Sequence, residues 1–433
     1  LGQDEKGRTR ILLNNKFVFQ VGALDQGYWP DGIYTAPTDA ALKYDIEIAK
    51  TLGFNLLRKH AKVEPQRWYY WCDRLGMLVW QDMPQAFGDL NDDAKAQWMT
   101  EWKREIATHS NHPSIIVWTT FNEGWGENTF DVPGVVALTK QLDPTRLVNN
   151  ASGWTDKGVG DFHDTHAYPG PWSEKPEPTR AAVNGEFGGV TMRVPGHIWT
   201  TGEVMGYGAT LQEGRLVTKR YQQLLKTGYD LMESQGTSAL VYTQLTDVEQ
   251  EINGLLTYDR AVIKPDIAII AAANKGQFLP LPPSPHPDLV PTSEEDAQTW
   301  RYTTDKPSDS WMQTSFDDTA WKSGPAPFGH DMGGVNTQWT GADIWIRREV
   351  TLPETIPADL VILVKHDEDA EIYVNGVLAG SVTGYAGEYV SVPMNAAGRA
   401  ALKPGKNVLA AHCHNTVGGQ GIDVGIAQAP AKP

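Results

Sequence analysis

Short apolar stretches alternate with amphipathic segments along residues 1–278. This alternation is typical of strands and helices that follow one another in a parallel sheet or a barrel. The pattern predicts eight strands, at residues 17–22, 54–58, 77–80, 115–120, 146–149, 162–167, 182–186 and 239–244.

Apolar residues at helical spacing separate many of these strands. The clearest helix places Ala94, Trp98, Trp102 and Ile106 at four-residue steps. Further helices are predicted from Thr38, near Pro65, and over 135–142 and 211–235. Eight strand–helix units match a (β/α)8 TIM barrel, an α/β fold, in number and length. A doubly wound open sheet is the alternative, but the first strand has no G-x-G-x-x-G, which disfavours a nucleotide-binding fold.

The pattern changes after residue 278. Residues 279–296 include the proline-rich stretch LPLPPSPHPDLVP, which predicts a semi-rigid linker. Strands of alternating polarity follow at 344–350, 360–365, 371–374 and 408–412. The dipeptide Asn375-Gly376 is a strong signal for a two-residue hairpin turn. Residues 297–433 are therefore expected to form an all-β, jelly-roll-like sandwich.

Composition narrows the class of protein. The chain has 433 residues, of which 40% are hydrophobic, and it contains no apolar run of the roughly 18 residues that a bilayer span requires. Its net charge of −16 argues against a nucleic-acid partner, whose phosphates attract basic surfaces. Cys72 and Cys413 fall in separate predicted domains, so we expect two unpaired thiols.

Two glutamates stand at or just after predicted strands, in glycine-rich surroundings. Glu123 lies in FNEGWGE, and Glu186 lies in NGEFGG. Because parallel strands open at their C-terminal ends into loops that build sites, these glutamates occupy positions where catalysis is common. Two carboxyl groups about 5–5.5 Å apart are the apparatus for retaining cleavage of a glycosidic bond. The sequence therefore predicts a glycosidase.

Other residues compete with this pair or support it. Alternative carboxylates are Asp82, Glu127, Asp164, Glu249 and Glu251. Candidates for stacking against sugar rings are Trp125, Trp154 and Trp172. His163 and His166, in DFHDTH, are good metal-ligand types. Retaining hydrolysis needs no metal, so we expect neither a metal nor another cofactor.

Several motifs resemble the barrel of glycoside hydrolase family 2, which contains β-galactosidases, β-glucuronidases and β-mannosidases. In chain order they are NLLRKH, VWQDMP, HPSIIVWTTFNEGWGE, NGEFGG and TQLTDVEQEINGLLTYDR, and the resemblance runs from about residue 14 to residue 275. It implies that Glu123 is the acid/base and Glu186 the nucleophile. It also implies that the arginine at position 58 steadies Glu186, and such a cation would lower the pKa of that carboxyl group.

The resemblance and the motifs together suggest a set of substrate-binding residues: Arg58, His60, Asp82, Asn122, Trp125, Tyr168 and Gln244. Tyr168 matches a hydroxyl that approaches the nucleophile. Gln244 departs from the family pattern, because many members have Trp or Asn at this position. Substrate cues conflict, since VWQDMP favours a mannosidase and Arg58-Lys59-His60 favours a galactosidase.

The expected function is a retaining exo-β-glycosidase that acts on terminal β-linked neutral sugars of an oligosaccharide or glycan. β-Galactosidase activity is the first expectation, and β-mannosidase or β-glucuronidase activity is the alternative within the family. A non-catalytic carbohydrate-binding barrel is the rival, although such a protein would not need both Glu123 and Glu186. An α/β esterase is disfavoured because no G-x-S-x-G is present.

The resemblance also bears on the surroundings of the barrel. Family members usually carry two β-sandwich domains before it, so the same polypeptide is expected to include such domains upstream. The C-terminal sandwich resembles the sugar-binding jelly rolls of the family, and it is expected either to bind sugar or to act as a spacer. A periplasmic or extracellular location is expected, because members that degrade polysaccharides are commonly exported.

Overall fold

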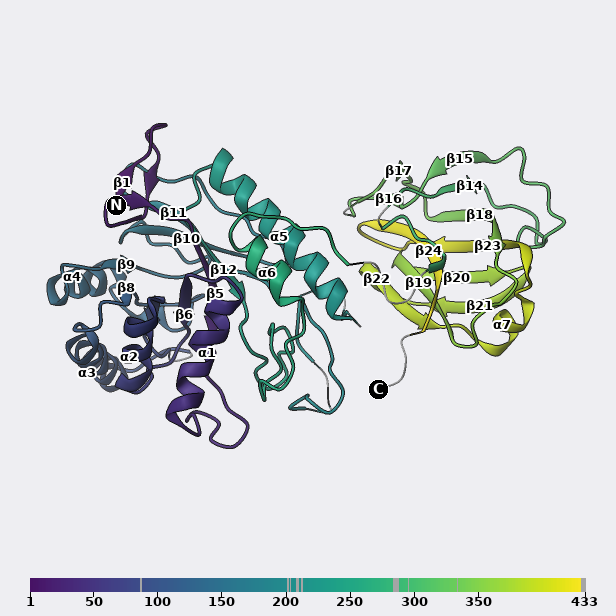
Figure 1. Ribbon diagram of the computed structural model, residues 1–433. Helices are drawn as coiled ribbons and strands as arrows, with labels where there is room; N and C mark the ends of the chain where they lie inside the picture. Colours follow the sequence, from purple (N-terminus) through teal and green to yellow (C-terminus); the bar gives the residue numbers. More distant parts are fainter. Residues whose placement is uncertain are drawn as a thin grey trace. The chain divides into compact units, whose positions relative to one another are not determined.

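The computed structural model describes residues 1–85, 88–200, 202, 204–207, 210–211, 213–282, 288–294, 296–332 and 334–429. The chain divides into two compact units, Leu1–Leu281 and Pro282–Pro433 (Figure 1). This division falls inside the segment 279–296, where the sequence predicts a linker. Residues 283–287 and 295 of that segment lie outside the described residues.

The first unit is built around an eight-stranded parallel sheet with the order β10-β11-β12-β5-β6-β7-β8-β9. The strands are β5 (Gln20–Asp25), β6 (Leu56–Lys59), β7 (Leu78–Asp82), β8 (Ile115–Thr119), β9 (Leu147–Asn149), β10 (Phe162–Ala167), β11 (Ala181–Gly188) and β12 (Ala239–Thr243). Because β12 pairs with β5, the sheet curls into a barrel that is closed except between β9 and β10. The predicted barrel is thus confirmed.

The first barrel strand begins three residues later than predicted. Lys16 and Phe17 belong instead to β4 (Lys16–Phe17), which pairs with β3 (Leu12–Leu13). The two residues between these strands, Asn14 and Asn15, have φ values of 51° and 63°. Asparagine tolerates this left-handed conformation, so the pair forms a tight turn. Upstream of this hairpin, β1 (Gly2–Gln3) pairs with β2 (Thr9–Arg10).

Six helices lie between or after the strands in the described part of this unit: α1 (Asp39–Thr51), α2 (Gln66–Leu75), α3 (Asp92–His109), α4 (Val132–Leu142), α5 (Gly214–Ser234) and α6 (Ile267–Ala273). The prediction of eight strand–helix units is wrong after β9 and β10. Residues 150–161 and 168–180 connect these strands without a helix. Both segments are rich in glycine or proline, which are the weakest helix formers.

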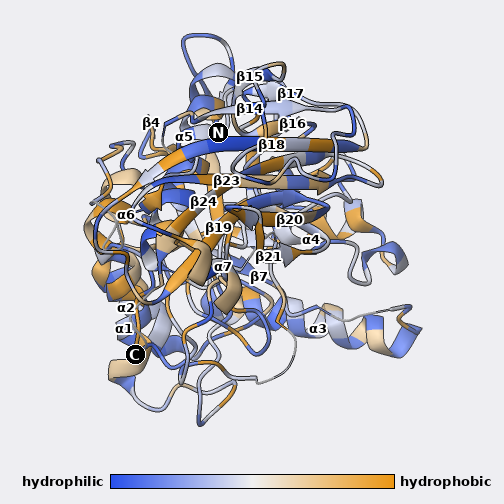
Figure 2. Ribbon diagram, turned by 90° about the vertical axis from the view of Figure 1, so that its right-hand side faces the viewer, coloured by the Kyte–Doolittle hydropathy of each residue, from blue (hydrophilic) through white to orange (hydrophobic). Residues whose placement is uncertain are grey.

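Local sequence signals fix where the helices begin. Thr38 and Asn91 each accept a hydrogen bond from a backbone N–H three residues on, which caps α1 and α3. Along α3, Trp98, Trp102 and Ile106 are buried as their spacing predicts. Figure 2 shows both hydrophilic and hydrophobic positions along this helix. The apolar positions pack on the barrel wall, and each full burial of this kind contributes about 1.5–3 kcal/mol.

The barrel interior has its own apolar core. It includes Ile11, Leu24, Leu56, Trp80, Val117, Phe162, Val183 and Val241, from seven of the barrel strands or the segment before them. A second, larger cluster fills the layer between strands and helices. These two cores leave the C-terminal strand ends as the place where polar side chains gather.

The second unit is all-β, as predicted, and contains two sheets. One sheet has the order β17-β16-β24-β19-β22, with β13 also paired to β24. Its strands are β13 (Asp288–Val290), β16 (Phe328–His330), β17 (Thr337–Gln338), β19 (Leu360–Asp367), β22 (Tyr385–Pro393) and β24 (Gln420–Gln428). The other sheet has the order β15-β14-β18-β23-β20-β21. Its strands are β14 (Thr299–Thr303), β15 (Lys322–Pro325), β18 (Asp343–Leu352), β20 (Asp369–Val374), β21 (Val377–Val382) and β23 (Gly405–His414).

The two sheets of this unit share one apolar core, which includes Trp300 and Ile344 from one sheet and Ile362 and Val424 from the other. This shared core makes the unit a sandwich. The predicted Asn375-Gly376 turn is confirmed, because these residues join β20 to β21 with φ values of 48° and 86°. The short helix α7 (Ala396–Ala401) follows β22.

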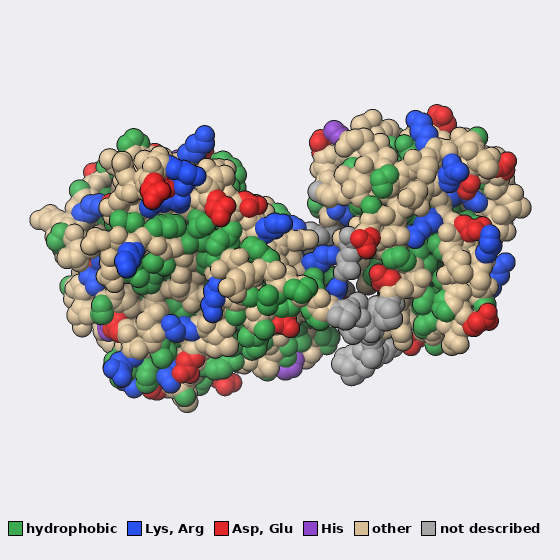
Figure 3. Space-filling view, turned by 45° about the horizontal axis from the view of Figure 1, so that its top comes forward, with side chains coloured by type: hydrophobic (Ala, Val, Ile, Leu, Met, Phe, Trp, Pro, Cys, Tyr) green, Lys and Arg blue, Asp and Glu red, His purple; other side chains and the backbone are tan. Residues whose placement is uncertain are grey.

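The charged surface, the helices and the two cysteines can each be compared with what the composition predicts. Figure 3 shows basic and acidic side chains interspersed on both units. None of the helices in the described parts of the chain has both the length and the apolar character needed to cross a membrane. Cys72 and Cys413 are buried and unpaired, as expected.

Candidate active site

The C-terminal ends of five barrel strands bring polar side chains together. They supply Arg58 from β6, Asp82 from β7, Asn122 and Glu123 after β8, His166 from β10 and Glu186 from β11. In a parallel barrel these ends meet at one face. The strand register shifts after Thr165 in β10 and after Asn184 in β11. These two irregularities change the direction in which the following side chains point. As a result, His166 lies directly beside Glu186 on the neighbouring strand.

Glu123 stands on a tight turn just past β8. Its φ is 50°, a left-handed value that is uncommon for a residue other than glycine. The turn is held in place because the backbone N–H of Glu123 donates to the carbonyl of Ser152 at 2.9 Å. Gly124, with a φ of 83°, continues the turn. Such strain is of order 1–3 kcal/mol and is typical of sites where geometry matters more than stability.

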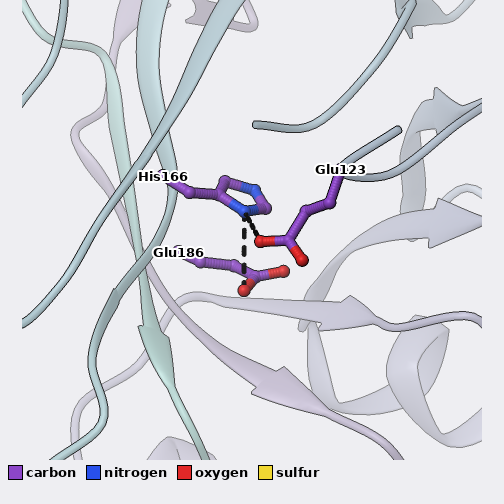
Figure 4. Close-up of side chains that lie close together, drawn as sticks. All are labelled: Glu123, His166 and Glu186. Atoms are coloured by element: carbon purple, nitrogen blue, oxygen red, sulfur yellow. Dashed lines mark hydrogen bonds and ion pairs between the residues drawn. The ribbon is translucent and has the colours of Figure 1, made fainter. Parts of the chain in front are cut away.

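The two predicted catalytic glutamates converge on His166 (Figure 4). His166 Nδ1 lies 2.7 Å from Glu123 Oε1 and 3.6 Å from Glu186 Oε2. A carboxylate oxygen of Glu123 and one of Glu186 lie within 4.8 Å of each other. This separation matches the short spacing of retaining glycosidases, about 5–5.5 Å, rather than the roughly 6.5–9.5 Å of inverting ones.

Arg58 binds several of the predicted residues at once. Its guanidinium is fully buried and donates to Glu186 Oε1 at 3.0 Å and to Asp82 Oδ2 at 2.8 Å. It also donates to Asn122 Oδ1 at 2.8 Å. The rigid fork of an arginine suits this kind of multiple contact. The structure therefore brings Arg58, Asp82, Asn122 and Glu186 into one network.

Electrostatics favour the charged form of Glu186. Burial alone would raise its pKa, but the charges of His166 and Arg58 outweigh burial and hold the pKa below its ordinary value. Tyr168 adds a hydrogen bond from its hydroxyl to Glu186 Oε2 at 2.6 Å. Burial and the charge of Glu186 raise the pKa of Tyr168 well above its usual range, so the phenol keeps its proton and donates.

His60 and Trp125 lie beside this network. His60 Nδ1 lies 3.1 Å from Asp82 Oδ2. The rings of His60 and Trp125 are 5.6 Å apart, centre to centre. Asn122 has a buried amide nitrogen, Nδ2, that finds no hydrogen-bond partner among the described residues. A donor of this kind fits a sugar hydroxyl, since an unsatisfied buried polar group is costly.

Comparison with known proteins gives a family match for part of the chain. Residues 9–169 match the description "Glycosyl hydrolases family 2, TIM barrel domain". This part of the chain is therefore similar to the barrel domain of glycosyl hydrolase family 2. A stretch of 157 residues is 31% identical to a putative β-glucuronidase of Formosa agariphila and covers 34% of this chain and 14% of that protein. A stretch of 158 residues is 31% identical to a β-galactosidase of Lactococcus lactis and covers 34% of this chain and 15% of that protein.

These matches span only a small share of each curated relative. Among solved structures, the chain is similar to a family 2 β-galacturonidase from Eisenbergiella tayi bound to galacturonate, with a TM-score of 0.49 and 21% identity. That likeness covers 63% of this chain and 54% of the other.

Gln244 is buried directly after β12 and contacts three polar side chains. Its amide nitrogen donates to Glu251 Oε2 at 2.7 Å and to Asn253 Oδ1 at 2.8 Å, and its oxygen accepts from Gln26 Nε2 at 3.0 Å. Burial first, and then the charges of Glu186 and Glu123, raise the pKa of Glu251. The sequence indicated Glu251 only as a competing carboxylate. In the structure it lies close enough to interact electrostatically with both Glu123 and Glu186.

The remaining aromatic candidates differ in position. Trp154 is exposed and meets the His166 ring edge-on, with 5.7 Å between ring centres. Trp172 is exposed, and its backbone oxygen accepts from the Thr165 hydroxyl. Tyr207, which the sequence did not single out, stacks on Tyr168 at 3.7 Å between ring centres. It is a further aromatic surface next to Glu186.

His166 is the main residue whose contact with Glu123 sequence reasoning missed, because we considered it only as a metal ligand. One signal could have found it. His166 lies near the end of β10 and Tyr168 directly follows that strand, and a spacing of two residues in extended chain places side chains on the same side. Glu127, one of the alternative carboxylates, is buried and accepts from the backbone N–H of Gly124 at 3.1 Å.

A separate cluster of donor atoms could hold a cation. Asp156, His163 and Glu177 offer atoms within 4.8 Å of one another. Arg180 already pairs with Asp156 at 2.7 Å and with Glu177 at 3.5 Å. The guanidinium thus supplies the positive charge that these carboxylates need, and the cluster is best described as an ion network.

Proposed function

We propose that this chain hydrolyses terminal β-linked sugars with retention of configuration, with Glu186 as nucleophile and Glu123 as acid/base. The observation that carries the proposal is the convergence of the two carboxyl groups within 4.8 Å in different surroundings. Glu186 is held in its charged form by Arg58 and His166, as a nucleophile must be.

The reaction has two steps. In the first, a Glu186 oxygen bonds to the anomeric carbon while the bond from that carbon to the leaving oxygen breaks, and Glu123 gives its proton to that oxygen. In the second, Glu123 takes a proton from water, the water oxygen bonds to the anomeric carbon, and Glu186 leaves as a carboxylate. Glu123 is protonated again and the cycle closes.

The neighbouring residues would orient the sugar and the nucleophile. Arg58 and Tyr168 hold one oxygen each of Glu186, which leaves the carboxylate little freedom to rotate. Asn122 Nδ2 is placed to donate to a sugar hydroxyl. Trp125, His60 and Asp82 would line the same subsite, with the aromatic face of Trp125 against the ring.

Charge favours a neutral sugar. His166, Arg58 and His60 act most strongly on Glu186 among the charged groups. Each already has a carboxylate partner, because Arg58 and His60 bind Asp82 and His166 binds Glu123. Glu251 adds further negative charge. The carboxylate of a uronic acid would therefore meet net repulsion, so β-galactoside hydrolysis is proposed first, with β-mannosidase and β-glucuronidase activity as alternatives.

A panel of nitrophenyl β-glycosides, assayed with wild type and Glu186→Gln, tests the proposal. We expect the galactoside to be cleaved faster than the mannoside and the glucuronide, and the variant to fold but remain inactive. Fast cleavage of the glucuronide would instead favour the activity named for the Formosa agariphila relative. Binding of sugars by folded wild type without any cleavage would favour the rival carbohydrate-binding barrel.

A further inference from the structure

His166 lies at the centre of a chain of hydrogen bonds that ends on the acid/base. Its Nδ1 is 2.7 Å from Glu123 Oε1, and its Nε2 is 2.7 Å from Ser152 Oγ. Ser152 Oγ in turn lies 2.6 Å from Asp164 Oδ2. The His166 side chain is fully buried, so these contacts are shielded from bulk water.

Asp164, at the far end of this series of hydrogen bonds, indicates which atom donates in each bond. Asp164 accepts from the Asn149 amide at 2.7 Å and from the backbone N–H of Gly185 at 2.7 Å. Asp164 Oδ2 also accepts the single proton of the Ser152 hydroxyl. Ser152 Oγ can then only accept from His166. His166 Nε2 therefore carries a proton and faces Ser152.

This tautomer leaves one proton for the short contact between His166 and Glu123. If His166 is neutral, Nδ1 is an acceptor and Glu123 must be the protonated donor. If His166 is charged, Nδ1 donates and Glu123 is a carboxylate. In both cases one proton lies between the two atoms, and it is the proton that the leaving group requires.

We propose that His166 is a positioning residue that retains the catalytic proton on the Glu123–His166 pair until the leaving oxygen takes it. This inference rests on the proposed function. The proton balance is unchanged, because the proton passes from the pair to the leaving group in the first step and returns from water in the second.

Charged groups from four parts of the barrel surround His166 and influence its protonation. Glu123 reaches it from the turn after β8, Glu186 from β11, Arg58 from β6 at 3.5 Å, and Asp164 from its own strand. Burial and the charge of Arg58 act to lower the pKa of His166, but Glu186, Glu123 and Asp164 together raise it. Gly153 lets the pair approach, since a Cβ there would lie 3.2 Å from His166 Nδ1 and 3.3 Å from Glu123 Cγ.

The structure implies a specific change in the pH profile of His166→Gln. Without the imidazole, the pair loses the member whose pKa is raised by the surrounding carboxylates, so the alkaline limb of kcat/KM moves down. Glu186 loses a group that lowers its pKa, so the acid limb moves up. The pH range over which kcat/KM is high therefore becomes narrower at both its acid and its alkaline end. A residue with only a structural role would lower activity without moving the limbs.

Leaving groups give a second readout. Acid catalysis matters most for poor leaving groups, so His166→Gln should lose about 10- to 100-fold more kcat/KM on a phenyl glycoside than on a dinitrophenyl glycoside. His163→Gln is the matched control, because it places the same substitution on the same strand, where His163 pairs with Glu177 instead. The control should leave both limbs in place.

Ser152→Ala keeps the test decisive if His166→Gln does not fold. It removes the group that fixes the tautomer, and a narrower profile of the same sign but smaller size is expected. Unmoved limbs with equal losses on all leaving groups, in whichever variant folds, would overturn the inference while leaving the proposed function intact. Absence of cleavage by folded wild type would instead overturn the proposed function.

Discussion

The ends of β8 and β11 each supply one glutamate to the same space, but they hold it differently. Glu186 is part of a strand, its side chain is 7% exposed, and Arg58 and Tyr168 fix its two oxygens. Glu123 lies beyond its strand on a left-handed turn, its side chain is 16% exposed, and it contacts the titratable His166. A fixed carboxylate whose pKa is lowered suits a nucleophile, and one with a proton-sharing partner suits an acid/base.

Glu186→Gln should have the largest effect, because it removes the nucleophile altogether. We expect turnover to fall by about 10⁴- to 10⁶-fold, whatever the leaving group. Steady-state kinetics on a series of aryl glycosides measure this loss, and circular dichroism checks the fold. Turnover close to that of wild type would remove Glu186 from its proposed role.

Glu123→Gln should instead show a loss that depends on the leaving group. General acid catalysis contributes roughly 10²–10⁴-fold, so substrates with poor leaving groups should lose that much and dinitrophenyl glycosides far less. Azide, a nucleophile that needs no base, should restore turnover and yield a β-glycosyl azide. Equal losses on every leaving group would contradict the division of roles between the two glutamates.

Arg58→Met tests what holds Glu186 in its charged form. The substitution leaves Asp82 and Glu186 buried without their cation, and breaking a buried ion pair in this way costs about 3–5 kcal/mol of unfolding free energy. Denaturant unfolding measures the cost. Arg67→Met is the control, because Arg67 pairs with Asp39 on the exposed surface and should shift the midpoint far less. Equal shifts would show that Arg58 has no special role.

Tyr168→Phe should have the smallest effect, a shift in the acid limb of the pH profile. The Tyr168 hydroxyl stabilises the Glu186 carboxylate and so lowers its pKa. In wild type, activity is therefore retained as pH falls until Glu186 protonates below its ordinary pKa. Without the hydroxyl, protonation occurs at higher pH and the acid limb moves up. Tyr229→Phe, whose hydroxyl donates to the Asn274 carbonyl, should leave the limb in place.

The fold could be predicted from the sequence where local signals were strong. The strand at 162–167 and the cap at Thr38 agree with the structure, because apolar pattern and capping chemistry act over a few residues. The first strand was misplaced because Asn14-Asn15 was not taken as a turn. The two missing helices were assigned from a count of units, although the segments after β9 and β10 contain the glycines and prolines that disfavour helix.

The candidate site could be predicted only in part, for a different reason. Glu123 and Glu186 stand out because each follows or ends a strand beside glycines. The role of His166 depends on Glu123, Ser152 and Arg58, which come from three other segments, and on the register shift after Thr165. Contacts between segments so far apart in sequence cannot be predicted from a local sequence pattern.

The most direct test of the account is to trap the glycosyl-enzyme. A 2-fluoro β-galactoside with a dinitrophenyl leaving group should inactivate the protein, because the fluorine slows both steps while the good leaving group keeps attachment of the sugar fast. Mass spectrometry of proteolytic fragments should then find the sugar on the peptide that contains Glu186. A label on Glu123, or hydrolysis with inversion and no label, would contradict the assignment of the two glutamates.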